Sequence, residues 1–70
     1  MDVREILAFN MRTLRSARGM SQEALADAAE IDRTYVSSLE RCQYSATIDT
    51  AQRIATALGV TLDTLLRMPE

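Results

Sequence analysis

The apolar residues of the chain recur at the spacing of α-helices. Between residues 2 and about 17, Leu7, Met11 and Leu14 fall at i, i+4 and i+7, which predicts a first helix with one apolar stripe. The same kind of repeat predicts four more helices, over 22–29, 33–41, 48–58 and 62–67. We therefore expect a compact, all-α domain of five short helices.

Capping residues mark the ends of these predicted helices. A residue suited to the N-cap precedes each of the last four helices: Ser21, Asp32, Thr47 and Thr61. Gly19 and Gly59 follow two helices and are suited to the left-handed residue that closes a helix C-terminus. Glu30 stands where a tight turn between helices favours a positive φ and hence glycine. We expect either strain at Glu30 or a turn of another shape.

The stretch from Ser21 to Arg41 holds two of the predicted helices back to back. Their apolar faces are formed by Leu25, Ala28 and Ala29 in the first and by Tyr35, Val36 and Leu39 in the second. Because only about three residues separate the two helices, they must cross at a steep angle. This pattern predicts a helix-turn-helix at about 21–41.

Length and composition limit the class of protein. A chain of 70 residues supports one domain, 1–70, and folding at this size buries only roughly 60% of the unfolded chain's surface, so a partner subunit would help. No apolar run approaches the roughly 20 residues of a membrane span, so we expect a cytoplasmic protein with no membrane partner. Because Cys42 is the single cysteine and there is no histidine, we expect no metal, no cofactor and no catalysis.

The charged residues are unevenly distributed. A net charge of −2 and a pI of about 5.0 argue against nucleic-acid binding when taken as averages. Five acids, however, lie in first turns of predicted helices, where they favour the helix dipole: Asp2, Glu5, Glu23, Asp49 and Asp63. All eight basic residues are arginine, and six lie between Arg4 and Arg41. Arginine is suited to bidentate contacts with phosphate and guanine.

Three segments, in order, resemble a known family: LRSARGMSQEALA (14–26), IDRTYVSSLER (31–41) and IATALGV (54–60). They resemble the phage repressor and Cro type of helix-turn-helix domain, the Xre-like family, and DRTYVSSLER is similar to the controller proteins of restriction-modification systems. The resemblance implies a five-helix, repressor-like DNA-binding domain. Its expected function is sequence-specific transcription regulation, as a homodimer on a two-fold symmetric double-stranded operator.

The helix 33–41 is expected to enter the major groove, with its N-terminal residues and outward face towards the base edges. The candidate base-reading residues are Arg33, Thr34, Tyr35, Ser37 and Ser38. Arg33 can make a bidentate contact with guanine, and Thr34 offers a hydroxyl and a methyl group. The ring of Tyr35 either packs in the core or carries its hydroxyl to DNA, and the resemblance favours DNA.

Three further polar residues are candidates for phosphate contacts. Gln22 opens a helix, where backbone N–H groups and a side-chain amide can hold a phosphate together. Arg41 and Gln43 come directly after the recognition helix and are expected to contact the flanking DNA backbone. Ordinary solvent exposure is the alternative for all three, and for the first-turn residues Arg33 and Thr34.

The resemblance also pairs Arg15 with Glu40. These residues are expected to form a partly buried ion pair that holds the recognition helix against the first helix. Cys42 departs from the family pattern, which commonly has glycine, or sometimes asparagine, for a left-handed residue there. An inert substitution and a redox switch activated by Arg41 both remain open for Cys42.

The end of the chain is rich in apolar residues: Val60, Leu62, Leu65, Leu66 and Met68. Some of them must close the domain's own core, and the surplus is the candidate homodimer interface, with Leu62 or Leu66 contributing. An alternative function is a helical protein-interaction or antitoxin-like module, for which the acidic surface would be the working face.

Overall fold

Side-chain caps determine where each helix begins in the computed structural model, which describes residues 1–69. The five helices are α1 (Val3–Ala17), α2 (Gln22–Ala29), α3 (Arg33–Glu40), α4 (Ile48–Leu58) and α5 (Leu62–Leu65). Ser21, Asp32, Thr47 and Thr61 cap α2 to α5 as predicted, each side chain accepting a bond from a backbone N–H of the first turn. Asp2 caps α1 in a capping box with Glu5. The described part of the chain contains no strand, so the prediction of an all-α domain is confirmed.

The first four helices end in the same motif. After each, the N–H of the second or third residue beyond the helix donates to a carbonyl five positions earlier, at 2.9–3.0 Å. The residue directly before this donor has a positive φ in every case: Gly19 (64°), Glu30 (58°), Cys42 (60°) and Gly59 (74°). Of the two outcomes expected for Glu30, the structure shows the strained left-handed conformation. Cys42 adopts the same conformation, which costs a residue with a side chain more than it costs glycine.

Replacing Glu30 with glycine is expected to raise the free energy of unfolding by about 0.5–1 kcal/mol. The left-handed conformation costs a residue with a side chain about 1–2 kcal/mol, and the greater backbone entropy of glycine offsets part of the gain. Urea denaturation measures the change. Glu23→Gly, in the exposed first half of α2, is the control and is expected to lower stability. A loss of stability in both variants would contradict the strain at Glu30.

The helix α5 is shorter than predicted and ends at Leu65 instead of about Arg67. The side-chain amide of Asn10, on α1, donates to the carbonyl of Leu65 at 2.7 Å and to that of Arg67 at 2.9 Å. These bonds satisfy carbonyls that a longer helix would have used internally. Asn10 therefore fixes residues 65–67 on α1.

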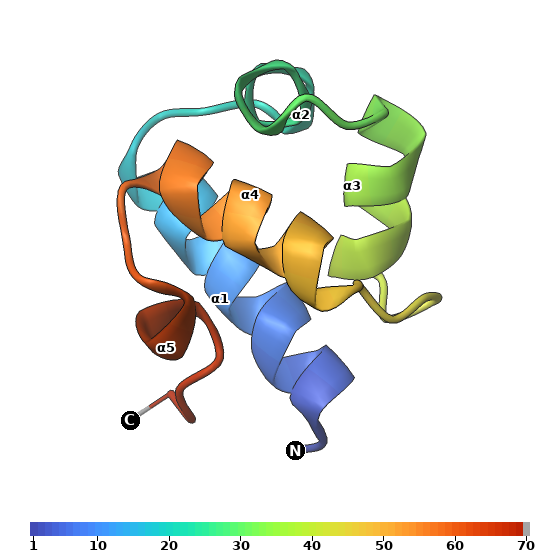
Figure 1. The fold of residues 1–70 in the computed structure, drawn as a ribbon, viewed down its shortest axis with the longest axis vertical. Helices are drawn as coiled ribbons and strands as arrows, with labels where there is room; N and C mark the ends of the chain where they lie inside the picture. Colours follow the sequence, from blue (N-terminus) through green and yellow to red (C-terminus); the bar gives the residue numbers. More distant parts are fainter. Residues whose placement is uncertain (70) are drawn as a thin grey trace.

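The core lies where the helices cross. In Figure 1, α1 and α4 occupy the middle, α2 lies at the top, α3 at the right and α5 at the lower left. The largest fully buried side chains come from all five helices: Met11, Leu25, Val36, Leu39, Ile54, Leu58 and Leu65. All lie on the apolar faces that the sequence pattern indicates. Among residues 1–69, none of the helices is long and apolar enough to cross a membrane.

Candidate nucleic-acid interface

The first turn of α3 is its open part. Arg33 and Thr34 are exposed and Ser37 is half-buried, whereas Val36 and Leu39 are at most 1% exposed. Asp32 holds the start of the helix by accepting a bond from the backbone N–H of Thr34 at 2.7 Å. Since α3 packs against both α1 and α2, its exposed first turn is presented by a fixed scaffold.

The structure corrects the prediction for Ser38. Ser38 is only 6% exposed, so its side chain does not lie where it could reach a base edge. The periodic pattern places Ser38 on the polar side of the helix, but the whole last turn, 38–40, is buried between neighbouring elements. Of the five predicted base-reading residues, Arg33 and Thr34 are exposed and Tyr35 and Ser37 are half-buried.

Tyr35 combines parts of both expectations. Its ring packs against the core, and its hydroxyl lies 3.5 Å from the carbonyl oxygen of Ser45. A bond of this length is weak, so the hydroxyl has capacity for another partner. The ring thus supports α3, and the hydroxyl remains a candidate for contact with DNA.

Glu40 is a buried charge held by side chains of α1. Its side chain is 2% exposed, and that of Arg15 is 20% exposed. Arg15 donates through Nε to Oε2 and through Nη2 to Oε1 of Glu40, both at 2.9 Å, and through Nη1 to the carbonyl of Met20 at 3.0 Å. The carbonyl of Glu40 also accepts a bond from Arg12. The last residue of α3 is therefore anchored to α1 by two arginines.

The hydrogen bond to Glu40 raises the pKa of Arg15 above its ordinary value; burial opposes this shift and the attraction of the carboxylate adds to it. Because the pKa is raised on folding, the charge of Arg15 stabilises the fold at every pH below the ordinary arginine pKa and this stabilisation is lost only above it. The anchoring of α3 by Arg15 therefore does not change across the physiological pH range.

The predicted phosphate contacts lie at the two ends of the helix-turn-helix. Arg41 and Gln43 are exposed directly after α3, as their expected role requires. Gln22 is half-buried at the first position of α2, and its Nε2 donates to Oε1 of Glu40 at 3.1 Å. Sequence reasoning missed this bond, and it missed Arg12 as an anchor of α3, because both contacts join residues far apart in the chain.

The predicted dimer face is only partly available. Leu65 is fully buried, which corrects its assignment, because the single turn of α5 points this side chain into the core. Val60, Leu62 and Leu66 are half-buried and pack against the core, and Met68 is 55% exposed. The surplus of apolar surface is therefore smaller than the sequence indicates.

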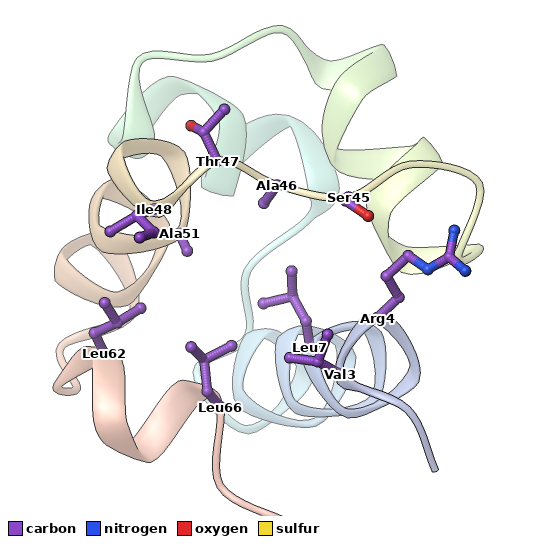
Figure 2. Close-up of a pocket in the computed structure, with 10 residues that line it drawn as sticks. All are labelled: Val3, Arg4, Leu7, Ser45, Ala46, Thr47, Ile48, Ala51, Leu62 and Leu66. Carbon is purple, nitrogen blue, oxygen red and sulfur yellow. The ribbon is translucent and has the colours of Figure 1, made fainter.

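An apolar pocket of about 200 Å³ lies beside this face. Figure 2 shows Leu62 and Leu66 on one side of it, with Val3 of α1 and Ile48 of α4 at its edges. Ile48 is 79% exposed and Val3 is 60% exposed. Sequence reasoning missed both residues. The available signal was that each is an apolar residue at the very start of its helix, where the side chain lies outside the core.

Among residues 1–69, no three His, Cys, Asp or Glu side chains are grouped so that they could hold a metal ion. Cys42 is a half-buried free thiol whose Sγ lies 3.8 Å from the carbonyl of Arg4.

Comparison with known proteins gives the family. A family model described as Helix-turn-helix, HTH_3, matches residues 11–65. A hypothetical transcription factor of Neisseria meningitidis is 44% identical over 99% of this chain, which spans 65% of that protein's length. The crystal structure of such a factor from Neisseria superposes with a TM-score of 0.94, over 97% of this chain and 78% of that one.

Two restriction-modification controller proteins are also similar. Control protein C.SmaI of Serratia marcescens is 41% identical, over 94% of this chain and 79% of that protein. The crystal structure of the controller protein C.AhdI of Aeromonas hydrophila has a TM-score of 0.85 and 35% identity, over 89% of this chain and 94% of that one. The chain therefore belongs to the HTH_3 family of helix-turn-helix proteins, whose relatives named here include a transcription factor and restriction-modification controller proteins.

Proposed function

We propose that this protein regulates transcription by binding a two-fold symmetric DNA operator as a homodimer, with α3 of each subunit in the major groove. One observation carries the proposal: Arg33 and Thr34 are exposed on the first turn of a helix whose other end is anchored by Arg12 and Arg15. A rigidly held helix that presents its N-terminal residues is the geometry with which helix-turn-helix proteins read bases.

The proposed base contacts follow from the chemistry of the exposed side chains. Arg33 donates to O6 and N7 of a guanine, and Thr34 contacts a base edge or a thymine methyl group. Ser37, one turn beyond Arg33, and the hydroxyl of Tyr35 belong to half-buried residues and are assigned to a base or a phosphate.

The proposed phosphate contacts lie on both sides of the recognition helix. The first N–H groups of α2 and the amide of Gln22 face one DNA strand, since a helix N-terminus favours an anion. Arg41 and Gln43, exposed beyond the other end of α3, hold the second strand. These contacts position α3 and carry no sequence information themselves.

Dimerisation compensates for the weak electrostatic attraction between a single subunit and DNA. With a formal charge of −2, a single domain gains little non-specific affinity for DNA, and two half-sites bound together compensate for this. The proposed interface contains Leu62, Leu66 and Met68, extended by the exposed Ile48. We propose that the protein acts in the cytoplasm, where the operator DNA of bacteria such as those that carry the relatives is found.

The proposal is tested by Arg33→Ala. It is expected to cost about 1–3 kcal/mol of operator binding, concentrated at one base position, because a bidentate guanine contact is lost. Titration of single-base operator variants measures this. The control is Arg53→Ala, which removes the same charge from an exposed position of α4 that is assigned neither to DNA contact nor to the dimer interface. Little loss for Arg33→Ala, with weakly salt-dependent DNA binding, would favour the protein-interaction module instead.

A further inference from the structure

The carboxylate of Glu40 joins the two ends of the helix-turn-helix. It is the last residue of α3, and it accepts two bonds from Arg15 and one from Nε2 of Gln22, the first residue of α2. Gln22 thus has a bonded partner inside the protein at the position from which it is proposed to contact a phosphate. None of the residues of this network is on the base-reading face of α3.

The chemistry of the two groups fixes which way the amide of Gln22 is turned. A carboxylate only accepts hydrogen bonds, so the side chain of Gln22 must present its nitrogen and not its oxygen to Glu40. A phosphate oxygen also only accepts, and it needs an N–H group from the same amide. Since the amide nitrogen carries two N–H groups, one can bond to Glu40 while the other remains for a phosphate.

Arg15 makes this arrangement compatible with DNA. A carboxylate close to a phosphate would ordinarily repel it, but both oxygens of Glu40 are bonded to the guanidinium of Arg15 at 2.9 Å. The charge of Glu40 is therefore matched inside the protein, and its remaining acceptor capacity is available to Gln22 at 3.1 Å.

We propose that Glu40 is a positioning residue for DNA binding, whose buried carboxylate orients the side-chain amide of Gln22 so that an N–H group is held ready for a backbone phosphate. The proposal rests on the DNA-binding function proposed above. The carboxylate of Glu40 would then fix both the end of the recognition helix and the phosphate contact of α2. The base contacts of α3 and the phosphate contact of Gln22 would therefore keep a constant position relative to each other.

The first test uses the free protein and does not depend on DNA. In a nitrogen-proton NMR spectrum, the two side-chain amide protons of Gln22 are expected to be well separated, with the one bonded to Glu40 exchanging slowly with solvent. The exposed amide of Gln43 serves as the control. If the side-chain amides of Gln22 and Gln43 behave alike, Glu40 does not hold Gln22 and the proposal is overturned.

The second test is a double-mutant cycle on operator affinity. Gln22→Leu removes the amide and is expected to weaken binding about tenfold in the wild-type background. Glu40→Gln preserves the size of the side chain but supplies a donor, so the amide of Gln22 is free to turn its oxygen inward. In that background, Gln22→Leu is expected to weaken binding less than about twofold, because the orientation has already been lost.

The outcomes of the cycle separate this proposal from the proposed function. Additive losses would show that Gln22 contacts DNA without help from Glu40, which overturns the positioning role. No loss for Gln22→Leu, together with a large loss for Arg33→Ala, overturns the positioning role and leaves the function standing. No loss for either variant contradicts the function itself. If Glu40→Gln does not fold, the NMR comparison of Gln22 with Gln43 decides the matter alone.

Discussion

Replacing Arg15 with methionine is expected to lower the free energy of unfolding by about 3–5 kcal/mol, because it leaves the charge of Glu40 buried without a counter-ion. The side chain of Glu40 is 2% exposed, and the bond from Gln22 alone does not compensate for the charge. A chain of 70 residues has a total stability of roughly 4–10 kcal/mol, so the variant is expected to be close to unfolding at ordinary temperature.

Urea denaturation followed by circular dichroism measures this effect. Arg18→Met is the matched control: Arg18 is exposed at the end of the same helix, and its replacement is expected to change stability by no more than about 0.5 kcal/mol. The double variant Arg15→Met/Glu40→Leu removes both charges and is expected to recover much of the loss, since an apolar pair can replace a buried ion pair. Equal stability of Arg15→Met and Arg18→Met would show that the pair does not anchor α3.

Replacing Ile48 with aspartate is expected to prevent dimerisation and to weaken operator binding on the order of 100-fold. In a symmetric interface the new charge appears twice, and burying an unpaired charge costs several kcal/mol, with each 1.4 kcal/mol worth about tenfold in affinity. The monomer is expected to keep its fold, because Ile48 is 79% exposed and an acid in a first helical turn favours the helix dipole.

Analytical ultracentrifugation at micromolar concentration and operator titration measure the two effects. Thr13→Asp introduces the same charge at an exposed position of α1 and serves as the control. It is expected to leave the dimer intact. A wild-type protein that is strictly monomeric, or an Ile48→Asp variant that remains dimeric, would exclude the proposed interface.

The elements of the fold were predictable because their signals are local. The caps Ser21, Asp32, Thr47 and Thr61 each bond within three residues, and the apolar stripes repeat at the helical period. The position of the turn at Glu30 was also predictable, but the sequence left open whether Glu30 would adopt a positive φ or the turn would take another shape; the structure shows the positive φ. Such features depend on a few neighbouring residues.

The features that were missed depend on contacts between distant segments. Ser38 is buried by neighbouring elements that the helical period of α3 does not reveal, and the pattern did not decide which of the apolar residues at 60–68 close the core, as Leu65 does. The bond from Gln22 to Glu40 spans 18 residues and the bond from Asn10 to the end of α5 spans 55, and neither leaves a periodic signal. The resemblance to a family supplied the pairing of Arg15 with Glu40, which periodicity alone would not have given.

Selection of bound fragments from random duplex DNA tests the central claim most directly. If α3 reads bases as part of a homodimer, the enriched sites are expected to be two-fold symmetric, with half-sites about one helical turn, or a multiple of it, apart. Arg33→Ala is then expected to relax selection at one position of each half-site. Recovery of unrelated sequences, or of a single site without symmetry, would contradict the account of this protein as a dimeric, sequence-reading regulator.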